Sequence, residues 1–538
     1  MALRKFDRRQ ENFELINPAE RIPEDHICFI VKDIVESVDF SKLNEKFLHT
    51  PGEPAYDREQ LAMLVLMGAV DGNFSGRDIE EQARFNFAYI YLSGNATPTY
   101  RTINRFKKEN KELMREVFVR TREIGRELGI VKLENLAIDG TTVKANASKN
   151  SRYDKIDLLI AKELVNKGIT VDTEEDILYD NKSGYTFTPE QFEQLKKELE
   201  KEYKIQDNKT KKNKKTHKKQ RKKKQKDKNT EKEDKNDKVN SMGIKKKVLK
   251  IVKQGEKNKS QTLKKIDEAL KRADEKNLDR ISLTDPYAYW GPNKQYYYQL
   301  FHNLQIIGDT DSRFIIDNKV VDAPTDMNQV EPLMTDLQSE IGHFDENTLL
   351  NLDNGYYSGE NLKYLEEQGF DALIPNKNQA SQAKGNTTGK FHKHKFKYNP
   401  INDTYTCPNE KILHHQSTSK KKVKLYYCND CHSCPDKNKC CKTNVRIISA
   451  YKNEQYMQKM KIKFEDENNK KKYNQRGIIE GNFGHIFNNL RFIGFQTRGN
   501  QNVQTEADIL SFANNTRRIH TEINKIKEKN QKLHQKNT

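Results

Sequence analysis

A run of lysines in the interior of the chain is the feature that most limits how these 538 residues can fold. Residues 209–228 contain thirteen Lys or Arg residues against the single acid Asp227, so the run holds twelve of the nineteen excess positive charges. Such a segment cannot bury enough apolar surface to offset its folding entropy. It would bind phosphates without sequence preference, although its composition favours a solvated linker. We therefore expect a disordered basic middle, residues 205–245, inside a helical insertion at residues 151–281.

Outside this run the chain has the composition of a globular protein of several domains. Its length is about twice that at which a single hydrophobic core stops growing. The net charge of +19 indicates a polyanionic partner, because a basic surface gathers phosphates. No apolar run reaches the roughly 18 residues of a membrane span, and no export signal follows the N-terminus, so we expect a cytoplasmic protein without a membrane partner.

The N-terminal region is predicted to be helical. Residues 24–110 follow a helical pattern, with expected helix starts at Ser75 and near Thr97. The second helix carries Arg101 and Arg105. We expect an all-helical N-terminal domain at residues 1–125 that could hold DNA, and a plain helical bundle remains an equally favoured interpretation.

An α/β core follows, interrupted by two insertions. Short apolar strands are expected at residues 136–143, 348–352 and 370–374, a hairpin at 295–321, and helices at 327–341, 358–368, 473–490 and 506–527. The strand, helix and strand over residues 348–374 predict a βαβ unit. The core would comprise residues 130–150, 282–375 and 473–528, and the second insertion, residues 376–472, carries a cysteine cluster.

Three acidic residues stand out by position. Asp353 directly follows an apolar strand, at the edge where open α/β sheets place their ligands, and Asp139 lies within another strand. For either aspartate alone, a role as a turn or cap residue is the favoured explanation. Glu480 shares a helix face with aromatic residues, where a buried carboxylate needs an ionic partner or a bound cation, and Arg476 could be that partner.

The motifs around these acids resemble those of the DDE transposases of bacterial insertion sequences, in the subgroup with a Tyr-Arg-Glu-Lys signature. They include Asp139-Gly-Thr, Leu352-Asp353-Asn-Gly-Tyr-Tyr-Ser, Tyr473-x-x-Arg476-x-x-x-Glu480, Phe495-Gln-Thr-Arg498-Gly, Thr102-Ile-Asn-Arg-Phe, Thr284-Asp-Pro and His302-Asn-Leu-Gln. The resemblance covers most of the chain outside the lysine run.

The resemblance implies a fold, a cofactor and a reaction. The expected fold is an RNase H-like mixed sheet with flanking helices, in which Asp139, Asp353 and Glu480 hold two Mg²⁺ ions, with Mn²⁺ as a substitute. Asp139 and Asp353 would be the principal ligands, and Glu480 would orient or deprotonate the nucleophile. Water would cut the transposon end, the freed 3′-hydroxyl would attack target DNA, and a hairpin intermediate fits the same family. Tyr473 and Arg476 would contact the terminal nucleotides.

The same resemblance implies the partners. They are double-stranded DNA, as terminal inverted repeats and as target, and a second copy of the chain, since synapsis of two ends calls for a homodimer. The setting would be a prokaryotic, nucleoid-associated cytoplasmic protein.

The chain departs from the family pattern at one place. The signature lysine would fall seven residues after Glu480, where this chain has Phe487. Residues 470–472, Arg491 or Arg498 could supply the phosphate-binding cation instead. The departure keeps open a catalytically dead DNA-binding regulator, and a metal-dependent nuclease that cuts without joining is a third hypothesis.

Six of the seven cysteines gather between Cys407 and Cys441. Close cysteine pairs are typical of tetrahedral zinc sites, and the candidate ligands for a structural zinc are Cys407, Cys428, Cys431, Cys434 and Cys440, with His414, His415 and His432 also available. Reduced thiols in a small subdomain are the alternative.

Overall fold

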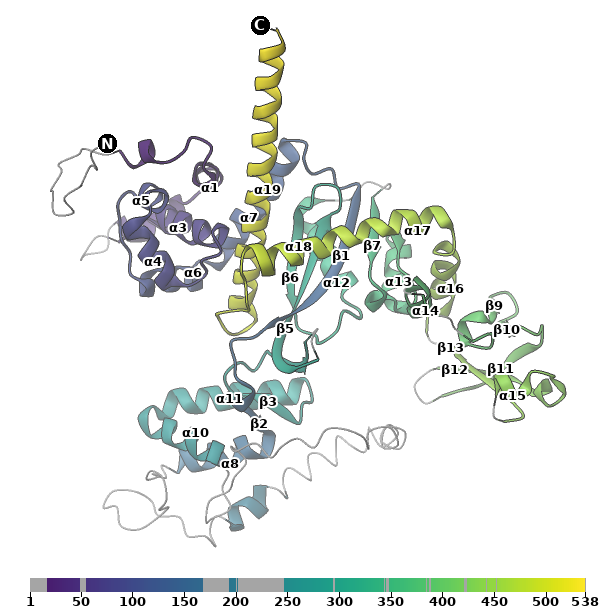
Figure 1. Cartoon of the computed structure of the whole chain (residues 1–538). Coiled ribbons are helices and arrows are strands. Elements are labelled where there is room, and N and C mark those ends of the chain that lie inside the picture. The colour runs from purple at the N-terminus through teal and green to yellow at the C-terminus, as the bar shows by residue number, and fades with distance from the viewer. Residues whose placement is uncertain are drawn as a thin grey trace, which may run out of the picture. The chain divides into compact units, whose positions relative to one another are not determined.

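The computed structural model describes the chain as two compact units (Figure 1). One unit comprises Met1–Val143 and Asn303–Thr538, and the other comprises Lys144–His302. The lysine run and the predicted disordered middle lie outside the described residues. Those residues are 17–48, 55–167, 193–199, 201, 246–293, 296–342, 344, 348–383, 385–386, 389–419, 423–441, 443–450 and 452–537.

A mixed sheet forms the centre of the first unit. Its strands are β1 (Asn135–Lys144), β5 (Tyr298–Asp309), β6 (Ile315–Val321), β7 (Leu349–Leu352) and β8 (Asp371–Leu373), and β4 (Tyr289–Pro292) pairs with the start of β5. The order is β6, β5, β1, β7, β8. The strands β1, β7 and β8 are parallel to one another, whereas β5 and β6 are antiparallel. The predicted mixed α/β class is therefore confirmed.

The local pattern explains these strands. All four residues of β7 are buried, as is usual for a parallel strand covered on both faces. The predicted hairpin is β5 and β6, and the predicted βαβ unit is β7, α13 (Gly359–Glu367) and β8, with Ser358 capping the helix. In the chain, the helix α12 (Val330–Ile341) comes between the hairpin and the βαβ unit. The strand β4 escapes prediction because Gly291 and Pro292 signal a turn.

The N-terminal region is helical, as predicted. Its elements are η1 (Pro18–Arg21), α1 (Ile27–Glu36), α2 (Ser41–Leu48), α3 (Arg58–Val70), α4 (Gly76–Phe85), α5 (Phe87–Leu92), α6 (Tyr100–Glu109) and α7 (Lys111–Glu127). The side chain of Ser75 caps α4, at the expected helix start. The helix α3 is buried almost throughout, because α1, α4, α5, α6 and the C-terminal helix α19 (Asn500–Asn537) pack around it.

The long helix α19 closes one edge of the sheet. It packs against α7 and β6, where its amide side chains take the place of a missing strand. Asn515 Oδ1 accepts from Ile315 N at 2.9 Å, and its Nδ2 donates to Ile315 O at 2.8 Å and to Thr121 Oγ1 at 3.0 Å. Gln504 Oε1 accepts from Val320 N at 2.7 Å. The edge of β6 therefore has its backbone groups satisfied within the core.

The segment that carries Glu480 is an interrupted helix. It comprises α16 (Glu454–Lys463), α17 (Glu467–Tyr473), the 3₁₀ turn η7 (Asn474–Arg476), α18 (Gly477–Gly484) and the π-helical turn η8 (His485–Asn489). The prediction of one continuous α-helix over residues 473–490 is wrong, because η7 and η8 flank the short α18 there. Glycines at 477, 481 and 484 weaken α-helical geometry by roughly 1 kcal/mol each relative to Ala.

The cysteine-bearing segment folds as an antiparallel sheet, which the sequence did not predict. The strands are β9 (Lys397–Asn399), β10 (Thr404–Thr406), β11 (Ile412–Thr418), β12 (Lys424–Cys428) and β13 (Arg446–Ala450), joined by the 3₁₀ turn η6 (Asn429–Ser433) and flanked by α14 (Lys377–Ala383), η5 (Lys393–Lys395) and α15 (Lys437–Cys440). Its small core includes Phe396, Tyr405 and Tyr426. The strands are short and their exposed faces polar, so no apolar periodicity marks them.

The second unit has a core of its own. Its elements are η2 (Lys149–Ser151), β2 (Arg152–Asp154), α8 (Lys155–Asn166), α10 (Lys246–Lys257), α11 (Lys259–Glu275) and β3 (Arg280–Ser282). Leu158, Ile251 and Ile266 are buried between the three helices. The helical character predicted for the described part of residues 151–281 is present.

No helix among those described, α19 with its 38 residues included, combines the length and apolarity needed to cross a membrane.

We expect Asn515→Leu to lower the free energy of unfolding by about 2–3 kcal/mol, because both backbone groups of Ile315 lose a buried partner. Urea denaturation of the full chain measures the change. Asn530→Leu, an exposed position on the same helix, is the matched control and should have an effect within about 0.5 kcal/mol. Equal stability of the two variants would contradict the role given to Asn515.

Candidate active site

Parallel pairing brings the two aspartates together. Ile138 of β1 is the register partner of Leu352 of β7, so the next residue on each strand is an aspartate, Asp139 or Asp353. Asp139 is held in place by the N–H of Gly140, which donates to its Oδ1 at 2.9 Å. The Asp139 side chain is 16% exposed and that of Asp353 41%. The two carboxylates therefore share one edge of the sheet, as expected for a ligand site.

Arg476 connects the aspartates to Glu480. Its Nη1 lies 3.5 Å from Asp139 Oδ2, and its Nη2 lies 3.8 Å from Asp353 Oδ1 and 3.0 Å from Glu480 Oε1. The three acids that the sequence singled out thus converge on one guanidinium. Residues more than 120 positions apart contribute to this cluster.

The environment of Glu480 differs from the prediction. The expectation that it lies buried in an aromatic stripe is wrong, because its side chain is 63% exposed. The buried face of α18 consists instead of Ile479, Asn482 and Phe483. Glu480 lies outside this buried face and so reaches the accessible side of α18. The pairing with Arg476 that the sequence suggested is present.

The cluster has the electrostatics of a cation site. Burial raises the pKa of Asp139 to about 6; Arg476 opposes this shift, and Asp353 and Glu480 add to it. Burial alone would lower the pKa of Arg476, but the neighbouring Tyr473 and the three carboxylates raise it. Like charges this close repel one another in a partly desolvated site, so the cluster favours a shared cation.

A network of polar side chains that the sequence did not predict lies beside Gly140, the residue after Asp139. Gln305 Nε2 donates to Asp326 Oδ1 at 2.7 Å, and Asn303 Nδ2 donates to the same oxygen at 3.2 Å. The buried Tyr356 hydroxyl donates to Gln305 Oε1. A Cβ added at Gly140 would lie 2.2 Å from Gln305 Nε2 and 2.5 Å from Asp326 Oδ1. The glycine therefore lets this network approach β1.

The motif at residues 302–305 could have revealed part of this network. Asn303 and Gln305 alternate along β5 and so face the same side, toward Asp326. In the second unit His302 faces the other way, and its Nε2 lies 2.8 Å from Asp285 Oδ2 of the Thr284-Asp-Pro motif. Both of these residues are almost fully buried. Asp326 lies in a turn, and the sequence around it has no pattern that indicates its role.

The remaining predicted DNA contacts are dispersed. The Tyr473 ring packs on Phe464 with ring centroids 4.9 Å apart, and the Arg476 guanidinium lies 5.8 Å from its centroid. Phe487, at the position of the signature lysine, packs against the core and Phe492. Arg491 and Arg498 are both exposed. Among these, only Tyr473 and Arg476 adjoin the acids.

The cysteines gather in the core of the small sheet. Cys428 and Cys431 are buried, and Cys407, Cys440 and Cys441 pack against them. Cys434 joins through Asn409, whose Nδ2 donates to Cys434 Sγ at 3.4 Å and whose N–H donates to Cys407 Sγ at 3.4 Å. Burial and the neighbouring thiols raise the pKa of Cys428 to about 12.

Neither cluster has the geometry of a formed metal site. Within the described ranges, no group of three or more His, Cys, Asp or Glu side chains is arranged to hold an ion. At the acidic cluster the Arg476 guanidinium is the cation that the carboxylates share. The donors remain chemically suitable, since carboxylate oxygens suit Mg²⁺ and thiolates suit Zn²⁺.

Two segments of the chain match models of protein families. Residues 17–109 match a transposase domain (DUF772), and residues 406–520 match a transposase DDE domain. The second match includes Tyr473, Arg476 and Glu480, whereas Asp139 and Asp353 lie outside both. Comparison with curated proteins and with solved structures gave no match.

We expect Gly140→Ala to lower the free energy of unfolding by about 2 kcal/mol, because the new methyl group separates Gln305 from Asp326 in a buried network. Chemical denaturation of the variant measures this loss. Gly481→Ala is the matched control, since a Cβ there meets no atom within 4 Å and α18 gains helix propensity. A Gly140→Ala protein as stable as the control would show that the network does not need the glycine.

Proposed function

We propose that this chain cuts DNA at transposon ends and joins the ends to target DNA, as a DDE transposase of an insertion sequence, which its matches to a transposase DDE domain and to a DUF772 transposase domain support. The observation that carries the proposal is the convergence of Asp139, Asp353 and Glu480 on one guanidinium. Three acids drawn from two strands and a distant helix would otherwise have no reason to meet.

The fold supports this proposal. One acid lies on the central strand β1, a second follows the adjacent parallel strand β7, and the third comes from a later helix. This mixed sheet with flanking helices is compatible with the RNase H-like fold that the motif resemblance implies. The catalytic core would then be residues 130–150, 282–375 and 473–528, with residues 151–281 and 376–472 as insertions.

Asp139, Asp353 and Glu480 would together hold two Mg²⁺ ions. When bound, such ions stabilise the attacking and leaving oxygens of an in-line phosphoryl displacement. The surroundings fit them, because the carboxylates offer hard oxygen donors and already hold the positive charge of Arg476 among them. Mn²⁺ has the same ligand preference and should substitute.

The chain's own residues would transfer the proton and contact the DNA. The exposed Glu480 carboxylate is accessible to accept a proton from the attacking water, whose oxygen would bond to phosphorus while the bond between phosphorus and the 3′-oxygen breaks. The 3′-oxygen would take up a proton from solvent and leave as a 3′-hydroxyl. Arg476 can pair with a phosphate oxygen at the same place. The 3′-hydroxyl would then attack a target phosphate. Tyr473, beside Arg476, would border the terminal nucleotide.

The N-terminal helices are proposed to hold the transposon end. Arg101 and Arg105 are exposed on α6, and Arg77 and Arg101 both lie over the ring of Tyr100. Lys107 is not available for DNA, because its Nζ donates to Phe74 O in a buried position. Inverted terminal repeats, target DNA and a second protomer at the synapse are the partners that this function requires.

The cysteine cluster is proposed to bind one structural zinc. Of the five candidate ligands, Cys407, Cys428, Cys431 and Cys440 lie in or against a single core, as Cys441 also does, and Cys434 is linked through Asn409. The N–H groups of Asn409 and Lys411 donate to Cys407 Sγ at 3.4 and 3.2 Å.

A catalytically dead regulator remains the second candidate. One observation favours it: Phe487 stands at the position of the signature lysine and packs against the core, so that position supplies no cation. Cleavage of the cognate end in vitro separates the two functions.

Alanine at Asp139, Asp353 or Glu480 should lower the rate of Mg²⁺-dependent end cleavage at least about 1000-fold, because each change removes a ligand from the ion pair. The assay follows nicking of a labelled duplex that carries the element's end. Glu467→Ala, an exposed acid on α17, is the control and should cleave normally. Undiminished cleavage by any of the three variants would refute the role assigned to that residue.

End cleavage at limiting Mg²⁺ should also fall by about tenfold per pH unit below about pH 6. The raised pKa of Asp139 means that its carboxyl takes up a proton in this range and no longer attracts a cation. Excess Mg²⁺ should restore the rate, since ions compete with the proton. A rate at limiting Mg²⁺ that is flat down to pH 5 would contradict this assignment.

Purified protein should contain about one zinc per chain, and Cys428→Ser should lose it. Elemental analysis of the folded fraction provides the measurement. Cys28→Ala, which removes a cysteine buried in α1, is the control and should retain the metal. Absence of stoichiometric zinc from the unmodified protein would remove the proposal.

A further inference from the structure

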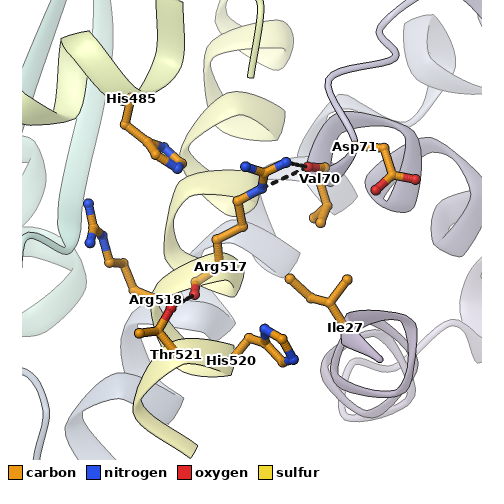
Figure 2. Close-up of a pocket in the computed structure, with 8 residues that line it drawn as sticks. All are labelled: Ile27, Val70, Asp71, His485, Arg517, Arg518, His520 and Thr521. Atoms are coloured by element: carbon orange, nitrogen blue, oxygen red, sulfur yellow. Dashed lines mark hydrogen bonds between the residues drawn. The ribbon is translucent and has the colours of Figure 1, made fainter. Parts of the chain in front are cut away.

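A cavity of about 350 Å³ in the first unit is lined by basic side chains (Figure 2). It lies beside α19 and the π-helical turn that follows α18, near the end of α3. The polar residues that line it are Asp71, His485, Arg517, Arg518, His520 and Thr521. In Figure 2 the Arg517 side chain is directed to Val70, and the Arg518 side chain extends to the other side of the view, near His485. No residue of the acidic cluster lines it.

The charge balance of this cavity favours an anion. Two arginines and two histidines face a single carboxylate, that of Asp71. Asp71 accepts a hydrogen bond from the Tyr89 hydroxyl at 2.9 Å, and burial raises the pKa of its carboxyl. The one acid is therefore already partnered, and its negative charge is disfavoured by its surroundings.

The two arginines are held partly out of water. Arg517 is fixed by Nε, which donates to Val70 O at 2.9 Å, and by Nη2, which donates to the same oxygen at 2.5 Å. For Arg518, no hydrogen bond or ion pair to another described residue is found. Burial lowers the pKa of both guanidinium groups. An anion in the cavity would offset this desolvation.

His485 lines the same cavity. Its Nδ1 is buried and has no hydrogen-bond partner in the part of the chain that the structure describes. Burial, and then the charges of Arg518 and Arg517, lower the pKa of this histidine to about 4. The ring is therefore neutral, and an anion in the cavity would pair with a ring N–H and raise its pKa.

We propose that this cavity binds a phosphate group. Its volume accommodates a phosphate with an attached sugar, and forked guanidinium donors match the geometry of phosphate oxygens. The phosphate comes either from a nucleic-acid backbone or from free inorganic phosphate. The site is separate from the three acids, so it stands whether or not the proposed DNA cleavage occurs.

The test uses the full chain with ¹³C-labelled histidine. Titration with inorganic phosphate should shift the His485 signal saturably toward that of a protonated ring, and His485→Gln identifies the signal by its loss. Calorimetry should show phosphate binding to Arg518→Gln weakened about tenfold. Lys525→Gln, which removes an exposed cation paired with Glu522 on the same helix, should bind as the unmodified chain does.

A random duplex oligonucleotide separates the two sources. If Arg518→Gln weakens the binding of both inorganic phosphate and DNA, the occupant is a backbone phosphate. If it weakens only the binding of inorganic phosphate, the occupant is free phosphate. A His485 signal that phosphate leaves unmoved in the unmodified protein would overturn the proposal, and this measurement does not depend on the stability of any variant.

Discussion

The candidate site depends on the register between two parallel strands. Because Ile138 pairs with Leu352, Asp139 and Asp353 are placed as neighbours by backbone hydrogen bonds alone. The strand β7 is buried at every residue, so its register cannot shift without exposing apolar side chains. Two like charges are thus fixed close together by the core, and the electrostatic cost of doing so must be offset at the site itself.

Arg476 offsets that cost in the structure. It lies within 4 Å of all three carboxylates, and it belongs to the same helical segment as Glu480. The segment can therefore bring a negative and a positive charge to the sheet edge together. Three carboxylates this close together need a cation among them, and a metal ion can take the place of the guanidinium. This is the physical basis for expecting divalent ions there. Arg476 would then be free to meet a phosphate.

The sequence predicted those parts of the fold that have local signals. The strands around Asp139 and Asp353 are short apolar runs, and the helix start at Ser75 is a cap, so pattern and residue type suffice. It could not predict that Glu480 is exposed, because the face of α18 that is buried depends on its packing against the core, through Ile479, Asn482 and Phe483. Asp326 accepts a hydrogen bond from Gln305, which lies 21 residues earlier in the chain, and Asn515 accepts one from the backbone of Ile315, 200 residues earlier. No local sequence pattern indicates partners this far away.

The central claim is that Asp139, Asp353 and Glu480 form one metal-binding site. Its most direct test is a crystal of the chain soaked in Mn²⁺, with the ions located by anomalous scattering. The account predicts Mn²⁺ about 2.1 Å from carboxylate oxygens of these three residues, with the Arg476 guanidinium displaced from them. Mn²⁺ bound elsewhere, with Arg476 still paired to all three acids, would contradict it.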